Sequence, residues 1–470
     1  MRRVRNIISA LGCIGLWSCG PVTAPPGSEQ VSEPAAINGM WASAGYGYLL
    51  DIDDEALRFF HVTPEFCMEA DLEGAGLEEV FGITRPSASG QQLYLSSATE
   101  PYEFRFDRID AIPERCETRP SSDPVTTVMM LSSLVQTHYG FLQERNIDWS
   151  TIETNLLEQI DENTTEEALY GYLTDALTEF HDAHVEMTAE VDGETRRFDA
   201  DPGLLREHVQ EIAARGGIPM REAGANFTTE FWVEGIGNTV LNGNGYSGAN
   251  DRFRFGMLPD DIGYIAIRSM GGFASREGEP SLSEAEALAA MLDEALSHFE
   301  SEQARAVVLD VSMNSGGYGY IARQIAARFM DRPIYPYSRF PWDAVDIDPF
   351  QQQITPHNGL RYDGPVVLLA SEASVSAAES LVLAMRSLDH VIQVGEPTRG
   401  ALSTKLAKPL PNGWEVMLSN EVILDHEGRL WEGRGIPPAI VFPVFVRGDL
   451  INSHQDAVER ARVIAVQQAE

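Results

Sequence analysis

One stretch constrains the fold of this chain more than any other. Residues 366–370 form a continuous apolar run, which is typical of a strand buried in a parallel sheet. Small and apolar residues then recur at helical spacing over residues 377–386, and residues 391–394 resemble the next strand. This order predicts a strand–turn–helix–strand unit, and further strand–helix alternation from residue 261 predicts an α/β core with a mostly parallel sheet.

A serine-rich turn, residues 371–376, joins the first of these strands to the helix. Ser376 is the best placed of its three serines, because it directly precedes the helix. There the backbone N–H groups and the helix dipole favour a developing oxyanion. Ser374 or Ser376 also suits the role of N-cap, the commonest one for a serine before a helix. This segment alone favours the N-cap role, and the neighbouring segments favour the nucleophile.

Length and charge narrow the class of protein. A chain of 470 residues predicts two or three domains, and a hydrophobic content of 43% is that of a globular protein with a core. The formal net charge is −37, and Lys405 and Lys408 are the two lysines of the sequence. Because no basic face is available to neutralise phosphates, we expect no nucleic-acid partner.

The N-terminus has the features of an export signal. Three arginines within the first five residues precede an apolar stretch, residues 7–17, that is too short to span a membrane and ends in LWSCG. This resembles a bacterial lipoprotein signal over residues 1–18, with Cys19 as the lipidated residue. Gly20 in the next position then indicates the outer membrane, on its periplasmic or surface face. The alternative is an ordinary secretory signal and a secreted product.

Two cysteines remain beyond this segment, Cys67 and Cys116. An even pair in an exported chain predicts a disulfide. Neither cysteine lies in a motif with the spacing of metal ligands, and no HExxH or CxxC motif occurs in the sequence. We therefore expect neither a metal nor another cofactor.

The composition changes along the chain predict its domains. Residues 19–36 are rich in Pro, Ser and Glu and form a tether without a core. Aromatic-rich segments that alternate apolar with polar residues predict a small antiparallel β domain over 37–117. Helical spacing then predicts a helical subdomain over 121–190, and polar, Gly-rich residues predict a β-rich connector over 191–260. The α/β core occupies 261–470.

Three scattered side chains supply the parts of a charge-relay site. A serine hydroxyl needs a base to take its proton, a histidine is the usual base, and a carboxylate orients the imidazole. Ser376, His184 and Glu432 can fill these roles. Each also has an ordinary interpretation: His184 can be a structural histidine, with His181 competing for its role, and Glu432 can be a charged turn residue.

A glycine pair completes the candidate site. Gly316 and Gly317 follow a buried strand in the segment DVSMNSGGYG, where backbone N–H groups can approach a ligand closely. Together with the N–H of Ala377 they would form an oxyanion hole.

Four segments, DVSMNSGG, SEASVSAAES, GEPTRGALS and EGRGIPPAI, resemble the tail-specific (C-terminal processing) and tricorn-core serine peptidases. The resemblance covers about residues 121–445 and implies a crotonase/ClpP-like α/β core with Ser376 as nucleophile. One branch of the family uses a lysine base at the position of Ala401, and Lys405 is out of register with it. The tricorn-like branch uses Ser, His and Glu, which this chain offers, and no PDZ module is recognisable before the core.

The sequence also departs from the family pattern. Ser312 stands where the family has an arginine, Ala439 where it has an aspartate, and Ala183 precedes the candidate base where a small polar residue is usual. These departures leave a second interpretation open, a ligand- or peptide-binding lipoprotein on a degenerate peptidase fold. A third, an acyl-CoA enzyme with a crotonase-like core, conflicts with the export signal.

These observations predict an exported, lipid-anchored serine endopeptidase. Its substrate would be a polypeptide, and the reaction would proceed through an acyl-enzyme on Ser376. With a histidine base, activity should rise through a pKa of about 6 to 7. The oligomeric state, the substrate and the cleavage preference stay open.

Overall fold

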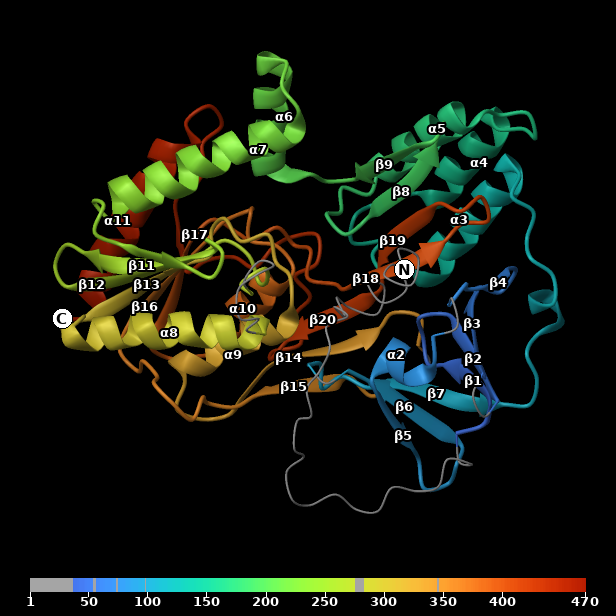
Figure 1. Ribbon diagram of the computed structural model, residues 1–470, viewed down its shortest axis with the longest axis horizontal. Coiled ribbons are helices and arrows are strands. Elements are labelled where there is room, and N and C mark those ends of the chain that lie inside the picture. The colour runs from blue at the N-terminus through green and yellow to red at the C-terminus, as the bar shows by residue number, and fades with distance from the viewer. Residues whose placement is uncertain (1–36, 54–55, 73–74, 98, 275–282, 345) are drawn as a thin grey trace. The chain divides into compact units, whose positions relative to one another are not determined.

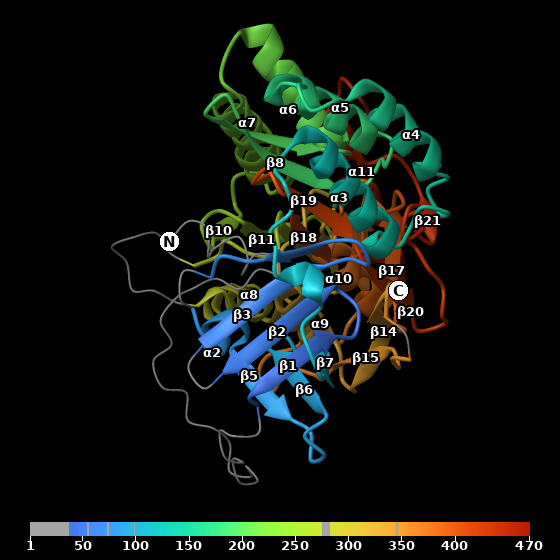
Figure 2. The ribbon, with the colours of Figure 1, turned by 90° about the vertical axis from the view of Figure 1, so that its right-hand side faces the viewer.

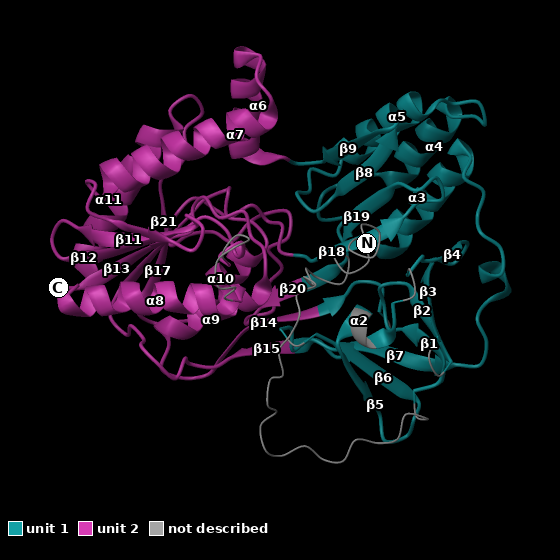
Figure 3. Cartoon of the chain, viewed as in Figure 1, with its two compact units in different colours: residues 1–201, 340–350, 403–422 teal, residues 202–339, 351–402, 423–470 magenta. Residues whose placement is uncertain are grey.

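The computed structural model describes residues 37–53, 56–72, 75–97, 99–274, 283–344 and 346–470. The chain divides into two compact units (Figure 3). Unit 1 comprises residues 1–201, 340–350 and 403–422, and unit 2 comprises residues 202–339, 351–402 and 423–470. The expected signal, the tether and the lipidation site at Cys19 lie outside the described residues.

A small antiparallel β domain begins unit 1, as expected from the sequence (Figures 1 and 2). Its elements are β1 (Gly39–Ser43), β2 (Tyr48–Asp53), β3 (Ala56–Val62), β4 (Cys67–Glu69), α2 (Leu77–Phe81), β5 (Ile83–Pro86), β6 (Gln92–Ser96) and β7 (Phe104–Ile109). They form one sheet in the order β4-β3-β2-β1-β7-β6-β5. Because side chains alternate across a strand, Trp41, Tyr48, Leu50 and Phe59 share one buried core.

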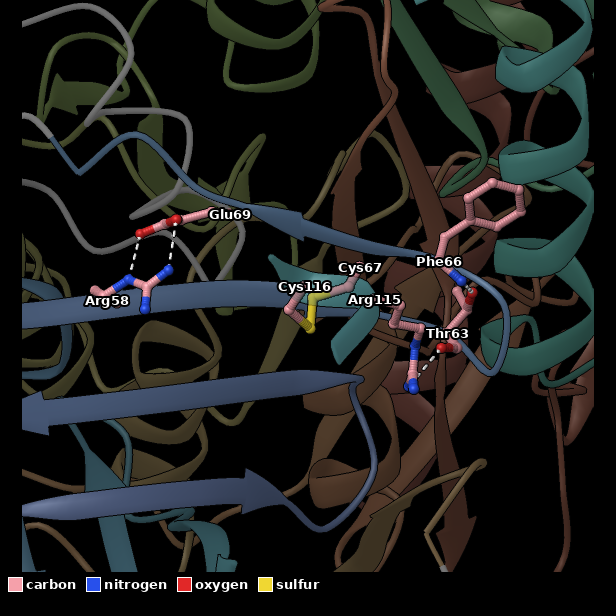
Figure 4. The surroundings of a disulfide bond; sticks show 7 residues. All are labelled: Arg58, Thr63, Phe66, Cys67, Glu69, Arg115 and Cys116. Carbon is pink, nitrogen blue, oxygen red and sulfur yellow. Dashed lines mark hydrogen bonds and ion pairs between the residues drawn. A yellow bond between two sulfur atoms is a disulfide. The ribbon is translucent and has the colours of Figure 1, made fainter. Parts of the chain in front are cut away.

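A disulfide closes this domain (Figure 4). Cys67 on β4 is joined to Cys116 on the short 3₁₀ helix η2 (Glu114–Cys116), with an S–S distance of 2.01 Å. Beside Cys116, Arg115 donates a hydrogen bond to the carbonyl of Thr63 at 3.1 Å. The end of the domain is therefore fastened to its β3–β4 edge.

Helices and a second sheet complete unit 1. The elements are α3 (Pro124–His138), α4 (Trp149–Gln159), α5 (Glu166–Thr178), β8 (Glu186–Val191), β9 (Glu194–Asp199), β18 (Lys405–Pro409) and β19 (Glu415–Ser419). The side chains of Asp123, Asp148 and Thr165 cap the three helices by accepting backbone N–H groups. The strands pair antiparallel in the order β18-β19-β8-β9, and α3 and α5 contact this sheet.

The expected β-rich connector over 191–260 is wrong for residues 203–240, which are helical. Helices α6 (Gly203–Gly216) and α7 (Met220–Thr228) are followed by a π-helix, η3 (Thr229–Val240). Phe227, Phe231 and Ile236 recur at helical spacing and are buried in the core of unit 2. Two glycines of this segment, Gly235 and Gly237, lie inside η3, and a Cβ at Gly237 would lie 2.6 Å from an Arg254 nitrogen.

A mostly parallel sheet organises unit 2, as the sequence predicts. Its elements are β10 (Tyr246–Gly248), β11 (Phe253–Leu258), β12 (Ile262–Ile267), α8 (Glu284–Ser301), β13 (Ala306–Asp310), α9 (Gly319–Ala326), η4 (Ala327–Phe329), β16 (Val366–Ala370), α10 (Ala377–Met385), β17 (Val391–Gly395), β21 (Ile440–Val441) and α11 (Leu450–Gln468). The order is β10-β11-β12-β13-β16-β17-β21, parallel from β12 onward. One apolar core joins the sheet to α8, α9 and α10, and a second joins it to η3 and α11.

A further sheet of the structure has three strands. Its strands are β14 (Ile334–Pro341), β15 (Phe350–Ile354) and β20 (Glu421–Asp425), in the order β15-β14-β20. β19 and β20 follow one another in sequence but belong to different sheets.

Among the described residues, no helix has the length and apolar character needed to cross a membrane.

Candidate active site

Ser376 lies at the N-cap position of α10, in unit 2, with φ 60° and ψ −118°. This backbone conformation is strained for a residue other than glycine and costs on the order of 1–3 kcal/mol. Two hydrogen bonds of the Ser376 N–H hold it, one to Glu379 Oε2 at 3.0 Å and one to the carbonyl of Ala401 at 3.1 Å. The turn between β16 and α10 therefore fixes a half-buried serine in an imposed geometry.

The other two serines of the turn have structural roles. Ser371 donates its hydroxyl to the carbonyl of Ser312 at 2.6 Å, and Ser374 donates its hydroxyl to the carbonyl of Val311 at 2.8 Å. Both side chains are fully buried. Their hydroxyls bind the neighbouring loop to the turn, whereas Ser376 remains partly exposed.

The glycine loop after β13 touches the Ser376 turn directly. A Cβ at Gly316 would lie 2.8 Å from Cβ of Ser376 and 2.6 Å from the carbonyl oxygen of Val375. Gly316 also has φ +80°, in the region that favours glycine. Only a residue without a side chain lets these two backbone segments approach so closely.

The N–H groups of this loop are not equally available. The N–H of Gly316 donates to Asn314 Oδ1 at 2.9 Å and is therefore occupied. Among the described residues, the N–H groups of Gly317 and Ala377 have no hydrogen-bond acceptor. The geometry therefore favours Gly317 over Gly316 as the partner of Ala377 in an oxyanion hole.

Asp310, the last residue of β13, anchors the glycine loop. Its carboxylate accepts hydrogen bonds from Tyr264 at 2.7 Å, from His454 Nε2 at 2.8 Å and from the hydroxyl of Ser312 at 2.7 Å. Burial alone would raise the pKa of Asp310, but His454 and the hydroxyl donors lower it overall. The role of His454 could not be predicted from the sequence, because His454 lies on α11, far from the four motif segments.

Glu379 is a second buried carboxylate that organises the turn. It accepts hydrogen bonds from the Thr398 hydroxyl at 2.7 Å and from the N–H groups of Ser376, Gly400 and Ala401 at 3.0, 2.8 and 3.0 Å. Burial raises its pKa, and the four hydrogen bonds oppose that shift. Glu379 thereby ties the Ser376 turn to the segment that follows β17.

Glu432 contacts that same segment within unit 2. Its side chain is 2% exposed, and its Oε2 accepts the N–H of Leu402 at 2.9 Å. The next residue, Gly433, donates its N–H to the carbonyl of Gly400 at 2.8 Å. Glu432 is therefore a fixed, buried group, and Ser376 and Glu432 are both bonded to residues 401–402.

His184 lies in unit 1, in the turn between α5 and β8. Its N–H donates to Asp182 Oδ1 at 2.8 Å, and Asp182 in turn accepts the Tyr139 hydroxyl at 2.9 Å. The imidazole is 2% exposed and is hydrogen-bonded to the backbone of Ser403. Its Nδ1 is buried and has no hydrogen-bond partner among the described residues.

The environment of His184 keeps the imidazole neutral. Burial, followed by the positive charge of Lys405, lowers its pKa to about 4, and Asp182 opposes the shift. This is lower than the value of 6 to 7 expected from the sequence. A neutral ring with a free nitrogen lone pair is the form that accepts a proton.

The two rivals for the role of base are placed differently. His181 is exposed and lies three residues after the end of α5. Lys405 Nζ is paired with Glu186 Oε1 at 2.5 Å.

Within the part of the chain that the structure describes, no group of His, Cys, Asp and Glu side chains is arranged to hold a metal ion.

The structure thus brings together Ser376, Gly317, Ala377 and Glu432 in unit 2, and it places His184 in unit 1. Residues 261–442, which contain all four unit 2 positions, match peptidase family S41. This match agrees with the resemblance of its motifs to the tail-specific and tricorn-type serine peptidases.

Individual relatives agree with this assignment. The carboxy-terminal processing protease CtpB of Bacillus subtilis (strain 168) is 25% identical over 179 residues, which cover 38% of this chain and 33% of that protein. The match thus spans about a third of the length of that relative.

Two solved structures share the fold. A candidate peptidase from Parabacteroides merdae matches with a TM-score of 0.56 and 21% identity, over 73% of this chain and 96% of that one. Mature CPAF complexed with lactacystin matches with a TM-score of 0.52 and 14% identity, over 73% of this chain and 99% of that one.

Proposed function

We propose that this protein is a serine endopeptidase that hydrolyses polypeptides through an acyl-enzyme on Ser376. The observation that carries the proposal is the close contact between the strained Ser376 turn and the glycine loop in unit 2. The N–H groups of Gly317 and Ala377, in the same two segments, support the proposal because they are free to donate to an oxyanion.

His184 is the proposed base and Glu432 the proposed orienting carboxylate. Three features support this assignment, and the first two are the unpartnered Nδ1 of His184 and the burial that keeps its ring neutral. A third is chain connectivity. Leu402, which binds Glu432, is followed directly by Ser403, which binds His184.

The proposed reaction follows from these groups. His184 Nδ1 takes the proton of the Ser376 hydroxyl as Oγ attacks the carbonyl carbon of the scissile peptide bond. The tetrahedral oxyanion accepts the N–H groups of Gly317 and Ala377. The imidazolium then gives its proton to the leaving amine, and a water molecule activated by His184 hydrolyses the acyl-enzyme.

We also propose that the protein is exported and anchored by a lipid on Cys19, with envelope or surface polypeptides as substrates. The N-terminal sequence supports the signal and the anchor. The disulfide between Cys67 and Cys116 is compatible with this, since such bonds persist in oxidising compartments. Secretion without an anchor is the alternative.

Hydrolysis of fluorescein-labelled casein tests the peptidase proposal. The full chain should release labelled peptides, and Ser376→Ala should abolish the release. Ser380→Ala is the matched control, because Ser380 lies one turn further along α10 and should leave the rate unchanged. Intact casein after incubation with the folded wild-type protein would instead support the binding protein on a peptidase fold.

A further inference from the structure

The β domain inserts one strained residue into a buried polar network of unit 1. Tyr46 lies in the turn between β1 and β2 with φ 64°, and its side chain is 4% exposed. A non-glycine residue in this region of backbone conformation is held there by its surroundings, and such strain gathers at functional positions. Four polar side chains from outside the β1–β2 hairpin surround Tyr46: Tyr102, Asp343, Lys408 and Glu421.

The backbone of Tyr46 is fixed from two sides. Its N–H donates to Asp343 Oδ1 at 3.1 Å, and Asp343 also pairs with His138 at 2.7 Å. The ammonium of Lys408, on β18, donates to the carbonyls of Tyr46 at 2.5 Å and Gly47 at 3.0 Å. These bonds aim the Tyr46 ring into the unit instead of toward solvent.

The Tyr46 hydroxyl reaches the start of β20. It donates to Glu421 Oε1 at 2.6 Å and also bonds the Tyr102 hydroxyl, at 2.8 Å. Glu421 is 2% exposed, so its carboxylate depends on protein donors for stabilisation. The β domain therefore supplies two tyrosines to this buried network, one of which is bonded to the carboxylate.

Glu421 connects this network to the candidate base. Its N–H donates to the hydroxyl of Ser403 at 2.9 Å, and the backbone of Ser403 is hydrogen-bonded to the imidazole of His184. The sequence of contacts is Tyr46, Glu421, Ser403, His184, and every member belongs to unit 1.

We propose that Tyr46 is a positioning residue for the base, so that the β domain serves catalysis by holding His184 through Glu421 and Ser403. This inference rests on the proposed peptidase function. Loss of the Tyr46 hydroxyl removes one hydrogen-bond donor from the Glu421 carboxylate. Glu421 then moves, and Ser403, which is bonded to it, moves with it. The ring of His184 then loses its fixed orientation while the surface that binds substrate is unchanged.

The test compares Tyr46→Phe with Tyr48→Phe in the full chain, using casein hydrolysis and thermal unfolding. Both variants remove a buried hydroxyl from the same turn region, but Tyr48→Phe leaves the bond between Tyr46 and Glu421 in place. Tyr46→Phe should lower kcat about tenfold and leave KM within about twofold, because the lost bond acts on the base alone. Tyr48→Phe should change neither constant by more than about twofold.

Equal kcat values for Tyr46→Phe and wild type would overturn the inference, and so would a rise in KM with kcat unchanged. If Tyr46→Phe does not fold, Glu421→Gln tests the same contact, and the inference predicts the same fall in its kcat. A wild-type protein that leaves casein intact would refute the proposed function itself, which separates the two failures.

Discussion

At the scale of single residues, the structure gives opposite environments to the two groups that we propose exchange a proton. Ser376 is partly exposed and strained, whereas the imidazole of His184 is buried beside cations. Burial and Lys405 together favour the neutral ring, so the proposed base is ready to accept a proton over a wide pH range. Low basicity is the corresponding cost, since a ring that resists protonation is a weaker base.

The pH dependence of kcat/KM reports this environment. Protonation of His184 removes the base, so activity should rise with pH through the pKa of the free enzyme, about 4, and level off before neutrality. The measurement is casein hydrolysis at substrate concentrations below KM. A rise centred at 6 to 7 would instead indicate an exposed histidine as base.

The pH dependence of kcat/KM in Lys405→Met tests the effect of Lys405 on the base. The positive charge of Lys405 lowers the pKa of His184, so its removal should move the rise in activity to higher pH. An unchanged profile would show that Lys405 does not act on the base, and complete loss of activity would revive Lys405 as a catalytic group.

At the scale of elements, the loop after β13 and the N-terminus of α10 act as one piece. The sequence predicted both, because a buried strand followed by a glycine pair, and a strand followed by a serine turn, are local signals. The preference for Gly317 over Gly316 could not be predicted, since it depends on the hydrogen bond from Gly316 to Asn314. Helices over 203–240 were missed because glycine and polar residues concealed a periodic apolar face.

Gly316→Ala tests the contact between these two elements. The added Cβ would meet Ser376 Cβ and the Val375 carbonyl, so kcat should fall by about 100-fold or more as the nucleophile is displaced. Gly428→Ala is the control, because Gly428 has φ +79° and nothing within 4 Å of its added Cβ. Both variants should lose about 1–2 kcal/mol of unfolding free energy from backbone strain, but the control should keep its kcat.

If both variants retain full activity, the glycine loop is not part of the site. Equal losses of activity in both would trace the effect to backbone strain alone.

At the scale of the whole molecule, contacts between residues distant in sequence decide the arrangement of unit 1. Tyr46 and Glu421 are 375 positions apart, and no local pattern in the sequence connects them. The sequence therefore identified the peptidase core through its motifs, whereas the network that links the β domain to His184 appears only in three dimensions.

Cys19→Ala tests the proposed anchor. In a bacterial host with an outer membrane, the wild-type chain should sediment with membranes and incorporate labelled palmitate, because a thioether-linked lipid partitions into the bilayer. Cys19→Ala should lose the label and leave the membrane fraction. Cys13→Ala is the control, since Cys13 lies within the apolar stretch, and it should behave like wild type. Retention of the label by Cys19→Ala would contradict the proposal.

The most direct test of the proposed nucleophile and base is covalent labelling by a fluorophosphonate. The rate of labelling is measured, and mass spectrometry of the peptides identifies the labelled residue. In the wild-type protein the adduct should form on Ser376. His184→Ala should nearly abolish its formation, and His181→Ala should label at the wild-type rate. An adduct on another residue, or wild-type labelling of Ser376 in His184→Ala, would contradict the assignment of nucleophile and base.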